Sequence, residues 1–136
     1  CGREEACGAA FRPVADLDQA RARLGSINGA PAKDIFLERI RSLMYQPSSA
    51  RRIPYIIKRA ADGDLTPFFA ATKPAGPNLY SDGMFLSVIC SESMALMDFA
   101  SAAAASEATR FGSYRLERQK QACAGWPGAS RCWPGP

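Results

Sequence analysis

Apolar residues along the first third of the chain recur at steps of three and four, which is the spacing of one face of an α-helix. The first such stretch predicts a helix over residues 14–27. We expect Asn28-Gly29 and Pro31 to end it. Its predicted buried face consists of Val14, Leu17, Ala20, Leu24 and Ile27.

A second helix is predicted to begin at Asp34, a residue type that commonly caps helix N-termini. Pro47 and the Ser48-Ser49 pair are predicted to end this helix and to precede the start of the next one. The predicted apolar stripe of this helix is Ile35, Phe36, Ile40, Leu43 and Met44.

A third helix is indicated by Pro54, because a proline in the first turn of a helix loses no hydrogen bond. Gly63, which follows Asp62, predicts a left-handed C-terminal cap. The expected buried face is Ile53, Ile56, Ile57 and Ala60.

The rest of the chain predicts shorter elements: a helix over residues 65–71, a loop over 73–82, partial helix over 94–110 and a last helix over 113–123. Phe85, Val88 and Ile89 favour a strand by propensity, but the sequence offers no partner strand, so we expect a buried helix over residues 82–93. The pattern as a whole predicts an all-α, irregular domain of about six or seven helices. We expect one domain over residues 1–136, with residues 125–136 as an irregular exit segment.

Composition and charge exclude several classes of protein. The 136 residues are 47% hydrophobic and 22% charged, which is typical of a globular chain, and the apolar runs are too short to span a membrane. Seventeen Lys and Arg against thirteen Asp and Glu give a net charge of +4. The basic residues are spread along the chain, which favours solvated helix faces over a nucleic-acid footprint.

Candidate catalytic chemistry is limited by the absence of histidine, which removes Ser-His-Asp, Cys-His and His-metal sites. The chain also lacks a Gly-x-Ser-x-Gly elbow, a phosphate loop and a dinucleotide fingerprint. We therefore expect no metal, no cofactor and no activity from this chain alone. If the protein acts in catalysis, the reacting groups lie elsewhere.

The cysteines indicate an oxidising compartment, because five in a chain of this size exceed ordinary cytosolic usage. They form no Cys-x-x-Cys pair, and their odd number leaves at least one thiol unpaired or paired outside the chain. They are Cys1, Cys7, Cys90, Cys123 and Cys132. Because the chain begins with Cys1, we expect either a processed product or an excised piece.

Several segments resemble, in their order and spacing, the lid inserted in secreted bacterial α/β-hydrolases of the tripeptidyl aminopeptidase and proline iminopeptidase group of serine hydrolases. The sharpest match is GMFLSVICSE at residues 83–92. The other matching segments are residues 1–7, 10–13, 44–47, 53–54, 60–64 and 122–127. In that family the nucleophile precedes the lid, and the acid and histidine follow it.

The resemblance implies a helical roof that gates and selects substrates for a serine exopeptidase acting at peptide N-termini. The implied partners are the catalytic α/β-hydrolase domain of the same parent protein and a small peptide substrate, with neither nucleic acid nor membrane. The implied location is secreted or periplasmic, in a bacterium. The implied disulfides join Cys1 to Cys7 and Cys90 to Cys123, which leaves Cys132 as the odd thiol.

The candidate binding residue is Glu92, because a lid glutamate at a similar place in related iminopeptidases binds the substrate's α-ammonium group. A carboxylate suits that role, since it pairs with an ammonium and rejects blocked peptides. The alternative is that Glu92 forms a salt bridge with a neighbouring arginine or caps a helix. Family members often carry a second acid next to this glutamate, whereas this chain has Ser93. Ser91 and Ser93 could orient the carboxylate, but we favour ordinary polar positions on a helix.

The apolar residues around Glu92 leave two interpretations open. They could line a substrate pocket, but core packing is favoured, since methionine fills cores more often. The set is Met84, Phe85, Met94, Met97 and Phe99. Trp126 and Trp133 could pack where a lid meets its catalytic domain.

Two other functions compete with the lid. One is a free-standing, secreted, disulfide-braced helical module that binds or inhibits a partner. The other, which is weaker, is a basic nucleic-acid-binding domain.

Overall fold

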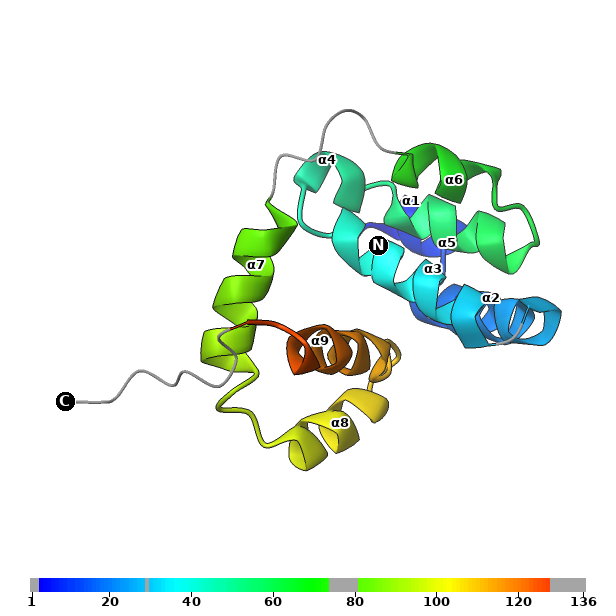
Figure 1. Ribbon diagram of the computed structural model, residues 1–136. Coiled ribbons are helices and arrows are strands. Elements are labelled where there is room, and N and C mark those ends of the chain that lie inside the picture. The colour runs from blue at the N-terminus through cyan, green and yellow to red at the C-terminus, as the bar shows by residue number, and fades with distance from the viewer. Residues whose placement is uncertain (1–2, 29, 74–80, 128–136) are drawn as a thin grey trace. The chain divides into compact units, whose positions relative to one another are not determined.

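The computed structural model describes residues 3–28, 30–73 and 81–127, and every regular element among them is helical (Figure 1). These residues form nine α-helices and one π-helix. Seven of the α-helices are seven residues or longer. The expected all-α fold is confirmed. The chain's contacts divide it into two compact units, residues 1–73 and 74–136, which are described separately. A single domain over residues 1–136 therefore stays a prediction.

The first unit is built on α2, which packs against both α3 and α5, while α5 also contacts α6. Its six helices are α1 (Glu5–Ala10), α2 (Pro13–Asn28), α3 (Ala30–Leu43), α4 (Pro47–Ala50), α5 (Ile53–Ala61) and α6 (Thr66–Thr72). The helices predicted over residues 14–27, from Pro54 and over 65–71 are confirmed as α2, α5 and α6.

The core of the first unit lies where α2, α3, α5 and α6 bring their apolar stripes together. All four residues predicted for the buried face of α5 are buried, and Ala61 joins them. The Phe36 and Phe68 rings, from α3 and α6, lie with their centroids 4.9 Å apart. The remaining buried apolar residues are Leu17, Ala20, Leu24, Leu37 and Ile40.

One prediction about α3 is wrong, and its predicted apolar stripe is confirmed only in part. Asp34 does not cap the helix, because α3 begins at Ala30 and has Pro31 in its first turn, where a missing N–H costs nothing. The buried stripe runs through Phe36, Leu37 and Ile40. Ile35 and Met44 are therefore half exposed at the edges of the stripe.

The buried face predicted for α2 holds only at its centre. Leu17, Ala20 and Leu24 are buried, but Val14, in the first turn, is exposed. The side chain of Ile27 lies outside the described residues.

Gly63 ends α5 with the left-handed cap that the sequence predicts, at φ +98°. The Gly63 N–H donates to the Ala60 carbonyl at 3.1 Å, and the Asp64 N–H donates to the Arg59 carbonyl at 2.8 Å. This pair of bonds is the Schellman arrangement. It turns the chain directly from α5 toward α6.

The second unit contains α7 (Asp82–Val88), the π-helix η1 (Ile89–Ser93), α8 (Phe99–Glu107) and α9 (Tyr114–Ala124). The Ser81 hydroxyl accepts the Met84 N–H and caps α7, and Asp98 accepts the N–H groups of Ala100 and Ser101 to cap α8. The helices predicted over residues 82–93 and 113–123 and the partial helix over 94–110 are present. Most of the predicted loop over 73–82 and of the exit segment lies outside the described residues.

The second unit buries little apolar surface among its described residues: only Cys90, Leu116 and Cys123 are buried there. The prediction that the helix over residues 82–93 is buried is therefore wrong for most of its length. Cys90 anchors the helix on one side, and the apolar residues on the other side are exposed. Half-exposed apolar stripes and buried ones share the same sequence spacing, so the pattern alone does not separate them.

Candidate functional site

The candidate site lies on the continuous rod formed by α7 and η1. The Met94 N–H donates to the Ile89 carbonyl at 2.9 Å, which is the five-residue hydrogen bond of a π-turn. Such turns are rare and occur often at functional sites, because the extra residue changes the direction of the side chains that follow. Glu92 lies inside this turn.

The rod is fixed to α9 by a disulfide between Cys90 and Cys123, whose Cα atoms lie 5.2 Å apart. This is the pairing that the family resemblance implies. Cys90 is 1% exposed, so the bond is on the covered side of the rod. Cys7 is also disulfide-bonded. Cys1 and Cys132 lie outside the described residues, so the expected partner of Cys7 stays a prediction.

Glu92 is exposed, and none of the residues that the structure describes forms an ion pair or hydrogen bond with its carboxylate. The alternative roles, a salt bridge to an arginine or a helix cap, are therefore not seen within residues 3–28, 30–73 and 81–127. Neither Ser91 nor Ser93 hydrogen-bonds to this carboxylate in that part of the chain. This agrees with ordinary polar positions for the two serines.

Met84, Val88 and Glu92 follow one another at four-residue steps, so they lie along one side of the rod. Met84 is 64% exposed and Val88 is 49% exposed. Phe85, 44% exposed, extends this side, so that the three apolar residues Met84, Phe85 and Val88 span an arc of about 100°. We call Met84, Phe85, Val88 and Glu92 the α7 face. Core packing, the favoured interpretation for Met84 and Phe85, is wrong.

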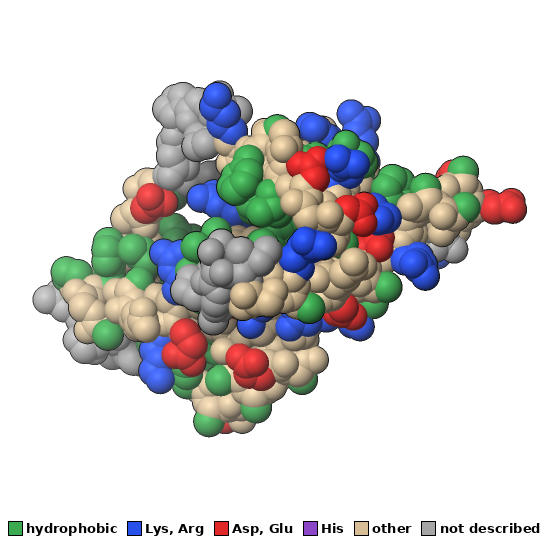
Figure 2. Space-filling model, turned by 90° about the vertical axis from the view of Figure 1, so that its right-hand side faces the viewer, with side chains coloured by type: hydrophobic (Ala, Val, Ile, Leu, Met, Phe, Trp, Pro, Cys, Tyr) green, Lys and Arg blue, Asp and Glu red, His purple; other side chains and the backbone are tan. Residues whose placement is uncertain are grey.

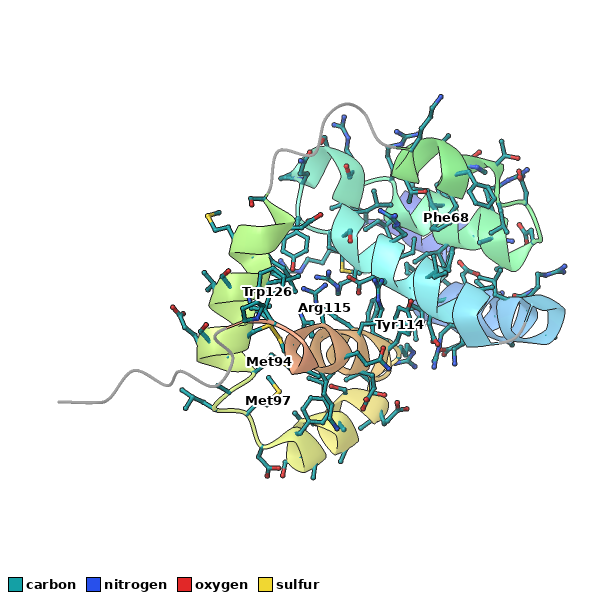
Figure 3. All side chains as sticks on the ribbon, viewed as in Figure 1. Phe68, Met94, Met97, Tyr114, Arg115 and Trp126 are labelled. Carbon is teal, nitrogen blue, oxygen red and sulfur yellow. A yellow bond between two sulfur atoms is a disulfide. The ribbon has the colours of Figure 1, made fainter. Side chains whose placement is uncertain are left out.

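The other apolar candidates have mixed environments. Met94 and Met97 lie in the segment between η1 and α8 (Figure 3), where Met94 is partly buried and Met97 is more exposed. The Lys120 ammonium lies 4.1 Å from the centre of the Phe99 ring. This cation–π contact links α8 to α9. A substrate pocket formed by these residues stays a prediction.

Trp126 is partly buried and packs near the start of α7. Its Cη2 atom lies 4.0 Å from the place that a Cβ atom on Gly83 would take. This is an ordinary van der Waals distance, so the indole packs against the start of α7. Trp133 lies outside the described residues, so a shared role for the two tryptophans stays a prediction.

Many basic residues are engaged in short-range pairs on helix surfaces. Arg41 forms a two-bond contact with Glu38, and Lys58 pairs with Asp62 one turn away. The Arg59 guanidinium and the Thr66 hydroxyl and N–H hydrogen-bond to Asp64 and lower the pKa of that carboxyl to about 2. On the face drawn in Figure 2, basic and acidic side chains are interspersed. This distribution supports solvated helix faces.

The described residues contain neither a candidate membrane span nor a candidate metal site. No helix among them is long and apolar enough to cross a membrane. No group of three or more Cys, His, Asp or Glu side chains in that part of the chain is arranged to hold a metal ion.

Sequence reasoning missed the π-turn and the exposure of Val88 and Leu96, the latter 82% exposed. A π-turn leaves no residue pattern, since it adds one residue to a helix without changing its composition. The exposure of this stripe also leaves no signal, because exposed and buried apolar stripes share the same helical spacing.

No family model matches the chain, and comparison with curated proteins and with solved structures gives no match either.

Proposed function

We propose that this chain is the substrate-gating lid of a secreted serine α/β-hydrolase that releases residues from peptide N-termini. The observation that carries the proposal is the state of Glu92: an exposed carboxylate, unpaired among the described residues, in a π-turn that a disulfide ties to α9. Such a carboxylate is available to a ligand. One already paired with an arginine would first have to break that pair.

The chemistry of Glu92 suits recognition of an α-ammonium group. A carboxylate accepts hydrogen bonds only, and its charge strengthens the bond to an ammonium as water is excluded. An acylated amine has no positive charge to offer, so the same site would discriminate against blocked peptides. The lid would thus select substrates by the state of their amino terminus.

The disulfide supports the proposed role in a second way. It anchors the π-turn from its covered side, so that the backbone around Glu92 is held while its side chain stays exposed. A disulfide of this kind persists in an oxidising compartment, which supports a secreted or periplasmic location. The proposed partner is the catalytic domain of the same parent protein, because this chain has no histidine to act as general base.

The reading frame of the gene tests the proposal without any assumption about the fold. A lid predicts a nucleophile elbow encoded upstream of Cys1 and a catalytic acid and histidine encoded downstream of Pro136. A stop codon soon after Pro136, with a signal peptide directly before Cys1, would contradict the lid. That result would establish the free-standing binding or inhibitory module instead.

A further inference from the structure

The second unit has almost no apolar core apart from its disulfide. Only three of its described residues are buried, and two of them are the bonded cysteines, Cys90 and Cys123. Leu116 of α9 is the third. Within this unit the only extensive packing between described elements is that of α7 with η1, which follow one another directly. A unit of this size needs a crosslink, a metal or a partner, because so little burial does not offset the conformational entropy lost on folding.

The first unit is built differently, because the buried residues that the structure describes there include no cysteine. Its helices α2, α3, α5 and α6 pack on one another, and Phe36, Ile40 and Ile56 are almost completely buried among them. Cys7, which is disulfide-bonded, lies in α1, a helix without buried residues. Breaking the disulfide of Cys7 therefore leaves the core of the first unit intact.

The helices of the second unit are too short to be stable alone. α7, α8 and α9 have 7, 9 and 11 residues, whereas an isolated helix below about 12–15 residues is marginal in water. The Cys90–Cys123 bond joins the rod, through η1, to the last turn of α9. Without this bond, Leu116 is the one buried apolar side chain left among the described residues of the unit.

We infer that the Cys90–Cys123 disulfide is a redox switch for the second unit alone. The oxidised chain is folded in both units. The dithiol chain keeps the first unit folded, while the second unit, which carries the π-turn and Glu92, unfolds locally. The inference concerns the fold and does not depend on the proposed lid function.

The switch is set by thiol–disulfide exchange. One of the two cysteine thiolates attacks oxidised glutathione, which forms a mixed disulfide and releases one glutathione thiol. The other thiolate then attacks the protein sulfur of the mixed disulfide and releases the second glutathione, so two protein thiols are oxidised as one glutathione disulfide is reduced. In the reverse direction a dithiol reductant reaches the bond only when the unit opens, because Cys90 is 1% and Cys123 9% exposed.

The test is amide hydrogen exchange of the full chain, read by mass spectrometry, with oxidised and dithiothreitol-reduced samples at the same pH and temperature. On reduction, peptides covering residues 82–93 and 114–124 should exchange about a hundredfold faster or more. Peptides covering residues 16–24 and 53–61 should change by less than about threefold. Oxidised glutathione should restore the slow exchange of the second unit.

Variants separate the two disulfides, because dithiothreitol also reduces the one that Cys7 forms. The double variant Cys90→Ser, Cys123→Ser, kept without reductant, should reproduce the fast exchange of the second unit. Cys7→Ser is the matched control: with its Cys90–Cys123 bond confirmed by non-reducing peptide mapping, it should exchange as wild type does over residues 82–93. Unchanged exchange of these residues on reduction or in the double variant would overturn the inference. Equal acceleration in both units would also overturn it, because the chain would then unfold as one body.

Discussion

A disulfide joins Cys90 in the π-turn to Cys123 in the last turn of α9, two residues that are 33 positions apart in the sequence. A crosslink over a loop of this length stabilises the folded state by roughly 3–4 kcal/mol in the chain-entropy description. It joins two of the three buried residues described in the second unit, Leu116 being the third. The disulfide therefore contributes much of the stability that a larger apolar core would contribute.

Replacing both cysteines by serine should lower the free energy of unfolding of the second unit by roughly 3–4 kcal/mol. Guanidinium unfolding followed by tryptophan fluorescence measures this change, because Trp126 packs against the start of α7. Non-reducing peptide mapping of the wild-type chain is the control. A link from Cys90 to Cys132 in that map would contradict the assignment.

Gly63→Ala should destabilise the first unit by about 1–3 kcal/mol, since φ is +98° there, a backbone conformation that strains any residue with a Cβ. The matched control is Gly25→Ala in α2, where nothing lies within 4 Å of an added Cβ. That variant should gain about 0.5–1 kcal/mol from helix propensity. Thermal unfolding of the two variants should therefore shift in opposite directions, and shifts of the same sign would argue against the Gly63 cap.

Ile56→Ala should cost about 2–5 kcal/mol, because Ile56 is 1% exposed in the core of the first unit and the truncation leaves a cavity. Ile35→Ala is the control on a half-exposed position of α3, and its effect should be within about 0.5–1 kcal/mol. Urea unfolding of both variants gives the comparison. Equal losses would show that the buried stripe of α3 includes Ile35.

The Arg59 guanidinium and Thr66 lower the pKa of the Asp64 carboxyl to about 2 from its ordinary 3.8. The stability of the turn that follows α5 should therefore depend on pH. A carboxyl with a lower pKa in the folded state stabilises the fold above pH 4 and loses this contribution as the pH falls toward 2. Asp64→Asn should therefore be less stable than wild type at pH 6, and the difference should shrink between pH 4 and pH 2. Melting temperatures across this range, with the Asp64 carboxyl titrated by NMR, check the direction. A difference that grows on acidification would contradict it.

Much of the fold follows from the sequence, because strong local signals coincide with packing. For α5, the sequence predicts the buried face of four apolar residues, the start near Pro54 and the end at Gly63, and each prediction has one physical explanation. The structure confirms all three features. The start of α3 was predicted four residues late, since Pro31 fits both the end of one helix and the first turn of the next.

The candidate site follows from the sequence only in part. The family resemblance identified Glu92 and the Cys90–Cys123 pair. No residue pattern predicts a π-turn, and none predicts that the Glu92 carboxylate has no ion pair among the described residues. The α7 face was expected in the core because Met84, Phe85 and Val88 have the same helical spacing as buried residues. Whether such a stripe is covered depends on what packs against it, which the local sequence does not contain.

The most direct measurement of the lid account is the substrate preference of the whole parent enzyme after Glu92→Gln. The amide keeps the shape of the side chain and removes its charge, so kcat/KM should fall roughly tenfold to a hundredfold for substrates with a free amino terminus. Amino-blocked peptides and simple esters should change little, and the melting temperature should stay the same, since none of the described residues pairs with Glu92. Equal losses on free and blocked substrates, or a collapse in melting temperature with preference unchanged, would contradict recognition of the ammonium by Glu92.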